Sequence, residues 1–399
     1  MTLAVPLDHV AKVQAAGLAA SPILPAFSEI CARLGLTEAE AAARVVADPD
    51  FVLDHVLMPA LADSIAPLDA LAKEADIIAS SIFAFSAGIV AEKRNLPLVD
   101  IVLQPMTMFS AWQPPHAPRF EAMRHAPNGP LGRAWNRMLY RIVRHLLRHR
   151  HGTGISAVRR ENGLGPSRAA VLIDRPATRV QTLCCYSPVL GPPCPDRPPN
   201  THVVGFPFFD SESGADEPLA TGLSAFLSEG EPPVVFSLGS IAWAAAGDFY
   251  KHAAAAAKRL GRRAVLLTGT GGFGREGDCV TIGYAPHSKL FKHCAAIVHH
   301  GGIGTTGQAL LAGCPQFVVP FFGDQHDNAA RVQDLKIGRS LSAILFSSEN
   351  AAAALRVILN DKGMRERAEL IGRQVMAENG AAEAARLIKC VIERATIEN

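Results

Sequence analysis

The stretch at residues 283–328 constrains the fold more than any other part of the chain. An apolar strand is expected over Ala295–Val298, a helix over Thr306–Ala312, and a second strand over Gln316–Pro320. Two histidines and a glycine-rich turn separate the first strand from the helix. The order strand, turn, helix, strand predicts a βαβ unit. In such a unit, glycines let backbone N–H groups approach a ligand at the helix N-terminus, which favours a diphosphate; here they are Gly301, Gly302 and Gly304.

Two kinds of ligand fit this turn. Gly302, Gly304 and Gly307 match G-x-G-x-x-G, and Asp324 lies near the spacing of a ribose-binding acid, so a dinucleotide is one interpretation. The other is a sugar nucleotide, because Asp324 is expected in a loop and is followed at once by Gln325. An acid beside an amide suits several sugar hydroxyls better than one ribose edge. A turn without a ligand is the third and least favoured interpretation.

Composition limits the remaining choices. The chain has 399 residues, 49% of them hydrophobic, and a net charge of +2, which predicts two domains and no bulk attraction to nucleic acid. Its eight cysteines form no C-x-x-C pair, so we expect buried, reduced thiols, no metal and a cytoplasmic protein. No apolar run reaches the length of a membrane helix.

Alternating strand and helix patterns predict an α/β fold with two parallel sheets. The acidic, small-residue run at residues 211–222 is the predicted linker between an acceptor domain at 1–210 and a donor domain at 223–380. The helix at 381–399 is expected to cross back to the first domain. Further expectations are a helix N-cap at Asp8 and a short strand over Val171–Ile173.

The chain begins with a predicted buried strand, Thr2–Val5. In a βαβ series, a strand, a loop and a helix would come before it. We therefore expect the first domain to lack this first unit, and its sheet to be open at the centre.

Two segments of the first domain suggest a surface for apolar or anionic molecules. The loop after the strand Leu98–Leu103 is rich in Met and aromatic residues, and it predicts either an apolar acceptor site or a packed loop: Met106, Met108, Phe109 and Trp112. Residues 122–160 hold nine arginines and no acid. Their helical spacing over Arg133–Arg150 is compatible with peripheral contact at the inner face of a membrane, with a solvated face backed by core residues, or with an anionic acceptor.

Three motifs occur in order: Gly283-Tyr284-Ala285-Pro286-His287, the run from His299 to Thr306, and Asp324-Gln325. Together they resemble the donor-binding signature of GT-B nucleotide-sugar glycosyltransferases of the UDP-glucuronosyltransferase, macrolide and sterol glycosyltransferase type. Over the whole chain, the closest likeness is to the rhamnolipid rhamnosyltransferases. The resemblance implies two Rossmann-like domains facing across a cleft.

The resemblance also implies roles for individual residues. Tyr284 would stack on the nucleotide base, and the backbone of Ala285 would bind its edge. Asp324 and Gln325 would bind the donor sugar, and Gln308 falls at a ribose-binding position. The diphosphate would be held by residues of three segments: Gly239, Ser240, His300, Gly302, Gly304, Thr305 and Thr306.

The implied reaction is transfer of a sugar from a UDP- or dTDP-sugar to a hydroxyl of an apolar small-molecule or lipid acceptor, with inversion and without a metal or other cofactor. The family's catalytic base lies in the loop after the first strand, upstream of Met1 here. Two alternatives follow: a donor-binding auxiliary or inactive fragment, and, less favoured, an NAD-dependent oxidoreductase.

Overall fold

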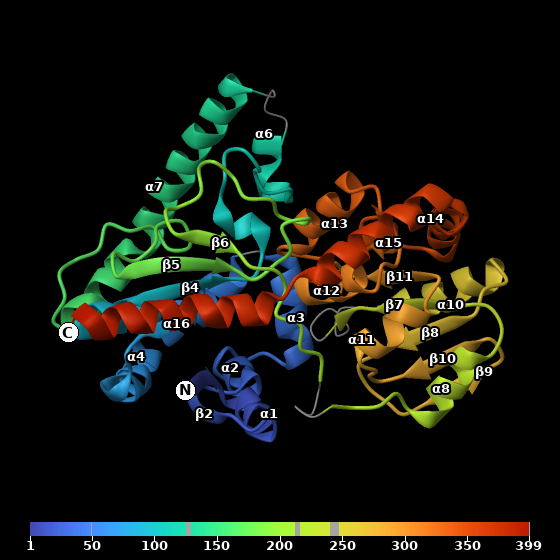
Figure 1. Cartoon of the computed structure of the whole chain (residues 1–399), viewed down its shortest axis with the longest axis horizontal. Helices are drawn as coiled ribbons and strands as arrows, with labels where there is room; N and C mark the ends of the chain where they lie inside the picture. Colours follow the sequence, from blue (N-terminus) through green and yellow to red (C-terminus); the bar gives the residue numbers. More distant parts are fainter. Residues whose placement is uncertain (49, 125–128, 212–215, 240–246, 399) are drawn as a thin grey trace. The chain divides into compact units, whose positions relative to one another are not determined.

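The computed structural model describes residues 1–48, 50–124, 129–211, 216–239 and 247–398 (Figure 1). The chain divides into two compact units. The first comprises Met1–Thr37, Asp50–Pro207 and Asn379–Asn399, and the second comprises Glu38–Pro49 and Phe208–Glu378. The helix at the end of the chain therefore packs within the first unit. Of the predicted linker at 211–222, residues 212–215 lie outside the described residues.

The first unit is built on a four-stranded parallel sheet of order β3-β4-β5-β6. A second, two-stranded parallel sheet joins β1 to β2. The unit thus has two sheets where the sequence predicts one sheet open at its centre. Its strands are β1 (Thr2–Pro6), β2 (Ala19–Leu24), β3 (Ile78–Ser81), β4 (Leu98–Val102), β5 (Arg179–Cys184) and β6 (Thr201–Val203). Its longer helices are α1 (Val10–Ala15), α2 (Phe27–Arg33), α4 (Ala60–Leu71), α5 (Phe85–Arg94), α7 (Pro130–Glu161) and α16 (Gly380–Glu398), and a short helix, α6 (Glu121–Arg124), precedes α7.

Helices cover both faces of the four-stranded sheet. Successive side chains of β4 point to opposite faces, and those of each face pack in a different cluster. Leu98 packs in a cluster with α4, α5 and the C-terminal part of α7, which includes Ile155. Val99, the next residue, packs in another cluster with Leu387 of α16. Two-sided burial explains why β4 is apolar at every position except Asp100.

The second unit has a seven-stranded sheet of order β13-β12-β11-β7-β8-β10-β9, parallel except for the pair of β9 with β10. Its strands are β7 (Val234–Ser237), β8 (Ala264–Leu267), β9 (Gly274–Glu276), β10 (Cys279–Ile282), β11 (Ala296–His299), β12 (Gln316–Val318) and β13 (Gly338–Ser340). The helices are α3 (Glu38–Ala47), α8 (Thr221–Ser228), α10 (Phe249–Arg259), α11 (His287–Leu290), α12 (Ile303–Leu311), α13 (Gln325–Asp334), α14 (Ser348–Asn360) and α15 (Lys362–Ala377).

The sheet of the second unit is also buried on both faces. Phe236 of β7 packs with α10 and α14 on one side, and the adjacent Val235 packs with α8, α11 and α12 on the other. Helices thus cover both faces of this sheet, and the ends of its strands are the parts that remain accessible to a ligand.

Three local predictions are wrong. The Asp8 carboxylate does not cap α1; it accepts a 2.6 Å hydrogen bond from the backbone amide of Phe27, the first residue of α2. Val171–Ile173 forms turns instead of a strand. Helix α12 begins at Ile303, three residues before the predicted start, so more of the glycine-rich segment is helical.

The cysteines are free thiols, as expected, but only five of the eight are buried: Cys31, Cys184, Cys185, Cys294 and Cys314. Among the described residues, no helix combines the length and apolar character that a bilayer-crossing segment requires.

The contact of α12 with α15 depends on two glycines. A Cβ on Gly372 of α15 would lie 2.7 Å from the Cα of Gly313, which follows α12 and has φ of +61°. A change of Gly to Ala inside a helix ordinarily stabilises it by about 1 kcal/mol. Here the backbone that the new methyl meets cannot move aside, and overpacking costs about 1–3 kcal/mol.

We therefore expect Gly372→Ala to lower the thermal unfolding midpoint of the chain. Gly363→Ala, near the start of the same helix, is the matched control, because its new methyl would meet only side-chain ends, the Arg367 guanidinium at 3.1 Å and Oδ1 of Asp361 at 3.5 Å, and no backbone. Unfolding followed by circular dichroism compares the two variants. A Gly372→Ala protein as stable as Gly363→Ala would contradict this description of the helix contact.

Candidate functional site

The sheet of the second unit changes direction between β7 and β11. The chain winds outward from β7 through β8 to β10, then returns to the other side of β7 to form β11, β12 and β13. Ser237, the last residue of β7, pairs with His299, the last residue of β11. Ligands of parallel α/β sheets bind outside the carboxyl ends of the strands at such a switch point. The loops after β7 and β11 are therefore the candidate site.

His299 is fully buried and holds the turn after β11. Its Nε2 lies 2.9 Å from Oε1 of Gln316 on β12, and its Nδ1 accepts a 3.1 Å hydrogen bond from the amide of Gly301. This arrangement requires the neutral tautomer with hydrogen on Nε2. Burial lowers the pKa of His299 to about 3, which keeps the ring neutral. His299 thus has a structural role, and the second histidine faces the site.

Gly301 makes the sharp turn that leads into α12. Its φ is +93°, and a Cβ there would lie 2.7 Å from Cγ1 of Val318 and 3.0 Å from the carbonyl oxygen of Gln325. The side-chain amide of Asn328, on α13, donates a 2.8 Å hydrogen bond to the Gly301 carbonyl. Both backbone groups of Gly301 are thus fixed, and so is the position where α12 begins.

His300 lies between two glycines of the candidate site. A Cβ on Gly239 would be 2.6 Å from Cε1 of His300, and one on Gly302 would be 2.4 Å from its Nε2. Only glycine at both positions leaves space for the ring. Burial lowers the pKa of His300 to about 4, with a smaller effect in the same direction from His287. The ring is therefore neutral near pH 7 and becomes a stronger base when an anion binds beside it.

The N-terminus of α12 lies directly after His300. Gly302 is its N-cap and offers no side chain to the first-turn amides. The Thr306 hydroxyl donates a 2.9 Å hydrogen bond to the Gly302 carbonyl, so this side chain stabilises the helix start. Gln308 is buried, and within the described part of the chain its Oε1 has no hydrogen-bond partner. Thr305 is buried in the same turn.

Asp324 and Gln325 lie at the start of α13. Oδ2 of Asp324 accepts a 2.9 Å hydrogen bond from the same Asn328 amide that binds Gly301. Burial raises the pKa of Asp324 to about 6, against the effect of the Asn328 hydrogen bond. Oε1 of Gln325 accepts backbone hydrogen bonds from Phe321 and Phe322, at 2.8 and 3.2 Å. Gln325 thus shapes the loop through its oxygen, which leaves its amide nitrogen as the group for a ligand.

Sequence reasoning missed Asn328 and the environment of His287. Asn328 lies four residues after Asp324, and this helical spacing places both on one face of α13. The spacing alone could have predicted that the two side chains interact. The His287 ring stacks on Phe291 with centroids 4.4 Å apart, and burial lowers the pKa of His287 to about 4. The carboxylate of Asp210 binds both the amide and the hydroxyl of Ser288, which fixes the start of α11.

The other described residues predicted to bind the donor lie in or beside the loops at the ends of β7, β10 and β11. Tyr284 is half-buried after β10, and the Ala285 side chain is buried in the core next to α11. Gly304 lies in the first turn of α12. Gly239, with φ of +66°, follows β7, and Ser240 lies outside the described residues.

In the first unit, the loop with the predicted acceptor residues is firmly held. Sδ of Met108 lies 3.6 Å from Sγ of Cys184 on β5, and Phe109 packs edge-on against Tyr140 of α7. Trp112 is 44% exposed, and its ring lies 4.0 Å from the Arg133 guanidinium. Met106 is half-buried. Of the four, only Trp112 offers a large exposed apolar surface.

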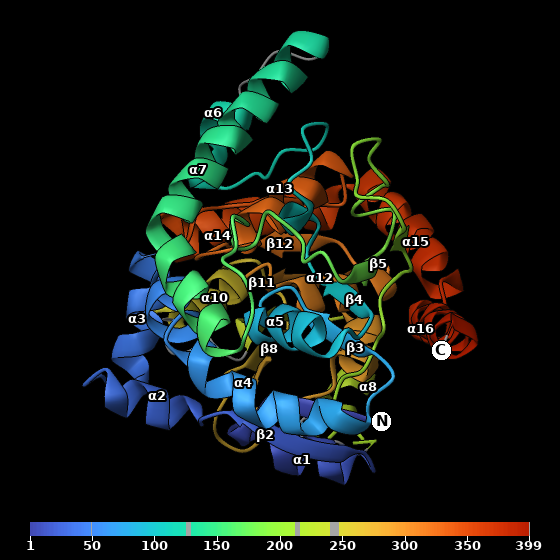
Figure 2. The same cartoon turned by 90° about the vertical axis from the view of Figure 1, so that its left-hand side faces the viewer.

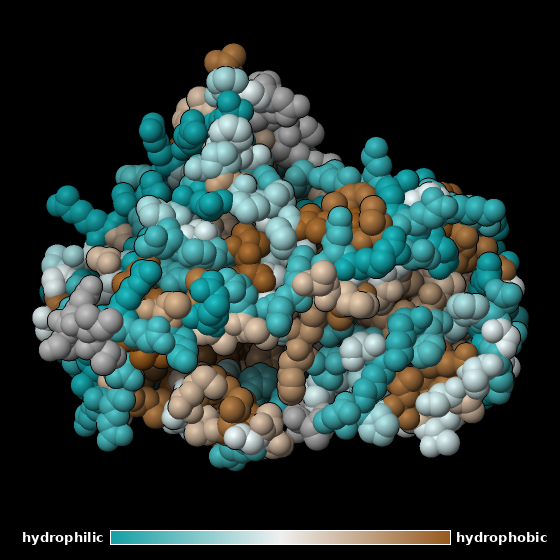
Figure 3. Space-filling model, viewed as in Figure 1, coloured by the Kyte–Doolittle hydropathy of each residue, from teal (hydrophilic) through white to brown (hydrophobic). Residues whose placement is uncertain are grey.

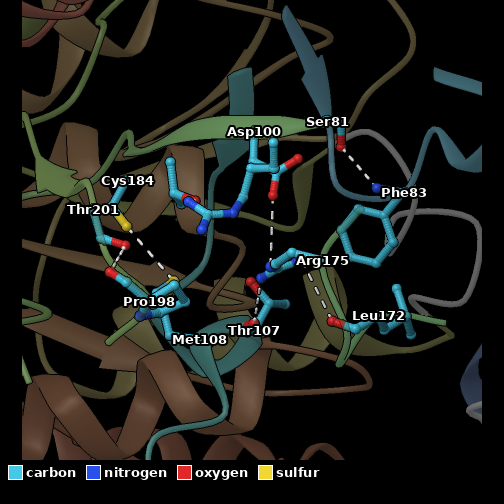
Figure 4. A network of polar contacts seen from close by, with 12 residues as sticks. Ser81, Phe83, Asp100, Thr107, Met108, Leu172, Arg175, Cys184, Pro198 and Thr201 are labelled. Carbon is cyan, nitrogen blue, oxygen red and sulfur yellow. Dashed lines mark hydrogen bonds and ion pairs between the residues drawn. The ribbon is translucent and has the colours of Figure 1, made fainter. Parts of the chain in front are cut away.

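A buried ion pair lies beneath this loop. Nε of Arg175 is 3.7 Å from Oδ2 of Asp100 on β4, and its other nitrogens donate to the carbonyls of Thr107 and Leu172 (Figure 4). Burial raises the pKa of Asp100 against the attraction of Arg175. Oδ2 of Asp100 has no hydrogen-bond partner in the described residues.

Both members of this ion pair line a cavity of about 400 Å³ in the first unit. Its wall also contains the charged residues Glu92, Arg159, Arg168 and Asp174. Serines and apolar residues line the rest, among them Ser80, Ser81, Phe85, Ile89, Leu98 and Ile155. Through Thr107, Arg175 connects this cavity to the loop.

No cluster of metal-binding side chains occurs among the described residues. The chain has one D-x-D triplet, at residues 48–50. Its Asp50 is paired with Arg150 of α7 at 3.0 Å.

Comparison with known proteins identifies the fold. The chain superposes on the glycosyltransferase of kitacinnamycin with a TM-score of 0.67 and 20% identity, covering 98% of this chain and 90% of that one. The spinosyn forosaminyltransferase gives a TM-score of 0.65 and 18% identity, covering 98% and 91%. The fold is that of the GT-B glycosyltransferases.

Residues 276–391 match the erythromycin biosynthesis protein CIII-like, C-terminal domain. The O-mycaminosyltylonolide 6-deoxyallosyltransferase of Streptomyces fradiae is 37% identical over 207 residues, 51% of this chain and 48% of that relative. The sterol 3-beta-glucosyltransferase of Arabidopsis thaliana is 33% identical over 206 residues, 50% and 32%. The chain thus spans less than half of these curated relatives. The closeness to rhamnolipid rhamnosyltransferases stays a prediction.

The buried His299 makes the second unit sensitive to acid. The pKa of a histidine is about 6.5 in the unfolded chain, against about 3 for His299 in the fold. Stability from the neutral ring is therefore complete above pH 6.5 and is lost as the pH falls, by about 2 kcal/mol at pH 5. Protonation at Nδ1 also removes the hydrogen bond from Gly301.

We expect His299→Gln to lower the unfolding midpoint at pH 7.5 but to weaken its decline between pH 7 and 5. His293→Gln, at an exposed position in the same unit, should leave both unchanged. Thermal unfolding across this pH range provides the comparison. An equal decline in wild type and His299→Gln would contradict the neutral, buried role of His299.

Proposed function

We propose that this chain, which has the GT-B glycosyltransferase fold, transfers a sugar from a UDP- or dTDP-sugar to a hydroxyl of an apolar small-molecule or lipid acceptor. The observation that carries the proposal is the placement of the α12 N-terminus and the neutral His300 together at the switch point between β7 and β11. The known proteins it resembles are glycosyltransferases, which favours a sugar nucleotide over NAD.

The donor's diphosphate would occupy the turn between His300 and α12. The first-turn amides and the helix macrodipole attract its negative charge, and the imidazole of His300 supplies a hydrogen bond or a proton. As the bond to the sugar breaks, the departing diphosphate gains charge, and these groups stabilise that charge without a metal. Tyr284 and the Ala285 backbone would bind the nucleotide base. The buried Oε1 of Gln308, which has no partner among the described residues, would accept a hydrogen bond from a ribose hydroxyl.

The donor sugar would bind at the start of α13. An ionised Asp324 accepts hydrogen bonds from hydroxyls, and the Gln325 amide donates one. Asn328 keeps Asp324 in place and connects it to the diphosphate turn through Gly301. Sugar and diphosphate would thus be held by one hydrogen-bonded unit.

The reaction we propose is direct displacement at the anomeric carbon with inversion. The acceptor oxygen forms the new bond, the bond to the diphosphate breaks, and the hydroxyl proton passes to a base. In the family that the chain resembles, this base lies in the loop after the first strand of the acceptor domain.

For the acceptor, we propose the loop with Met106, Met108, Phe109 and Trp112 together with the cavity beneath it. The cavity of about 400 Å³ is of the size that small-molecule sites have, and its wall combines apolar side chains with serines and charged side chains. Arg175 lines the cavity and donates a hydrogen bond to the Thr107 carbonyl, which links the cavity to the loop.

His300→Ala should weaken binding of UDP and dTDP by about 10- to 100-fold, because a hydrogen bond to a charged group contributes about 1.5–3 kcal/mol. Isothermal titration calorimetry on the full chain measures this directly. His293→Ala, which changes an exposed histidine of the same unit, is the control. Unaltered diphosphate affinity in His300→Ala would refute the donor assignment, and binding of NADH in preference to UDP would favour an oxidoreductase.

Asp324→Asn should separate sugar recognition from nucleotide recognition. We expect it to weaken binding of a UDP- or dTDP-sugar while UDP and dTDP affinities stay near wild type. In the wild type, the advantage of the sugar nucleotide over the free nucleotide should shrink as the pH falls through about 6, because protonation removes the accepting carboxylate. Titrations at pH 7.5 and pH 5.5 test both points; a pH-independent advantage, or equal losses for both ligands, would exclude Asp324 from the sugar site.

A further inference from the structure

Helix α7 exposes an apolar stripe along much of its length. Five large hydrophobic side chains are exposed at helical spacing: Leu131 (80%), Trp135 (43%), Met138 (40%), Ile142 (49%) and Leu146 (59%). Steps of four, three, four and four residues place them on one side of the helix. The sequence-based alternative, a basic face backed by core residues, is therefore wrong for Trp135, Met138, Ile142 and Leu146, whereas Leu139 does pack against a core cluster.

The opposite side of α7 holds the helix to its unit. The side chains of Asn136 and Tyr140 are buried and donate hydrogen bonds to the carbonyls of Ala111 and Ser110. Further along, Ile155 packs in the core with β3 and β4. The N-terminal half of α7 extends away from the four-stranded sheet (Figures 1 and 2). The stripe is thus not the main packing face of the helix, and its one side-chain hydrogen bond in the described residues runs from Nε1 of Trp135 to the Ala122 carbonyl of α6, at 3.0 Å.

Positive charge lies on α7 between the stripe and the packing side, with Arg141 nearer to the stripe than Arg137. Arg144 and Arg148 are paired with Asp174, and Arg150 is paired with two other acids. Arg137 and Arg141 are exposed and have no ion pair in the described part of the chain. In Figure 3, the N-terminal end of α7 shows hydrophobic surface next to hydrophilic side chains.

We propose that α7 docks on the surface of a lipid bilayer that contains anionic lipids. The five apolar side chains enter the boundary between headgroups and acyl chains, and Arg137 and Arg141 contact lipid phosphates. An amphipathic helix with an apolar face and arginines beside it has this binding mode, and a tryptophan prefers the interfacial depth. Each arginine near an anionic surface strengthens binding about fivefold.

The charge favours a lipid surface over a second copy of the chain. Two α7 helices that paired through this stripe would bring their unpaired arginines close together, and residues 122–160 contain no acid to compensate them. Phosphate headgroups supply the missing negative charge. A helix pair through the stripe is thus disfavoured by like-charge repulsion.

Docking would also serve the proposed function, on which this step rests. Arg133, on the same side of α7 as the buried Tyr140, lies over the Trp112 ring of the acceptor loop. A helix lying on the bilayer would therefore hold that loop on its far side, about one helix diameter (roughly 10 Å) from the lipid in which apolar acceptors dissolve. The inferred substrate class is a hydroxyl-bearing molecule that partitions into membranes.

The test is co-sedimentation of the full chain with vesicles of phosphatidylcholine alone and of phosphatidylcholine mixed with phosphatidylglycerol. We expect binding to the mixed vesicles that weakens as salt is raised. Ile142→Gln with Leu146→Gln should reduce binding at least about tenfold by removing buried apolar surface. Arg137→Gln with Arg141→Gln should remove about tenfold or more of the preference for the anionic vesicles.

The matched control is Leu370→Gln with Met376→Gln, which changes two exposed apolar residues of α15 (50% and 68%) and should leave vesicle binding unchanged. Circular dichroism verifies that each variant is folded. No binding to mixed vesicles, or equal loss in the α15 control, would overturn the proposal. So would self-association of the chain, seen by sedimentation velocity, that Ile142→Gln with Leu146→Gln abolishes.

Vesicle binding needs no donor, and UDP titration needs no vesicle. Failure of docking therefore leaves the donor assignment intact, and loss of UDP binding leaves docking intact.

Discussion

The pairing of β7 with β11 is the constraint on which the second unit's site depends. Ser237 and His299 end adjacent strands at the same level, so the backbone turns that follow them meet. Gly239 and Gly302 then leave space for one imidazole between the two turns. A single change in strand order would separate His300 from Gly239 and leave the α12 N-terminus without its histidine.

Some polar groups around the turn after β11 fix the backbone, and others are available to a ligand. His299, Gln316 and Asn328 are buried, and they fix the backbone of Gly301 and the carboxylate of Asp324. His300 remains neutral because it is buried, and Asp324 has a raised pKa for the same reason. Both groups are thus poised to change charge or gain hydrogen bonds when a ligand replaces water.

Much of this could be predicted from sequence because the determinants are local. The glycine-rich turn after β11 identified the helix N-terminus, and the apolar strands identified sheets buried on both faces. The early start of α12 was missed because Ile303 and Gly304 read as part of the turn, while packing in the folded unit extends the helix. Asp8 was assigned to α1, but its partner is the amide of Phe27, nineteen residues away, which no local pattern reveals. The sequence leaves open whether the apolar side of α7 faces the core or a membrane, because periodicity shows only that a face is apolar, and the fold shows what covers it.

The most direct measurement is amide hydrogen exchange of the full chain with and without UDP. We expect UDP binding to protect the peptides that follow β7 and β11, which begin at Gly239 and at His300 and include the first turn of α12. Protection is also expected around Tyr284 and Ala285. Unchanged exchange in the α12 segment, with protection elsewhere or nowhere, would contradict the claim that this helix N-terminus is the diphosphate site.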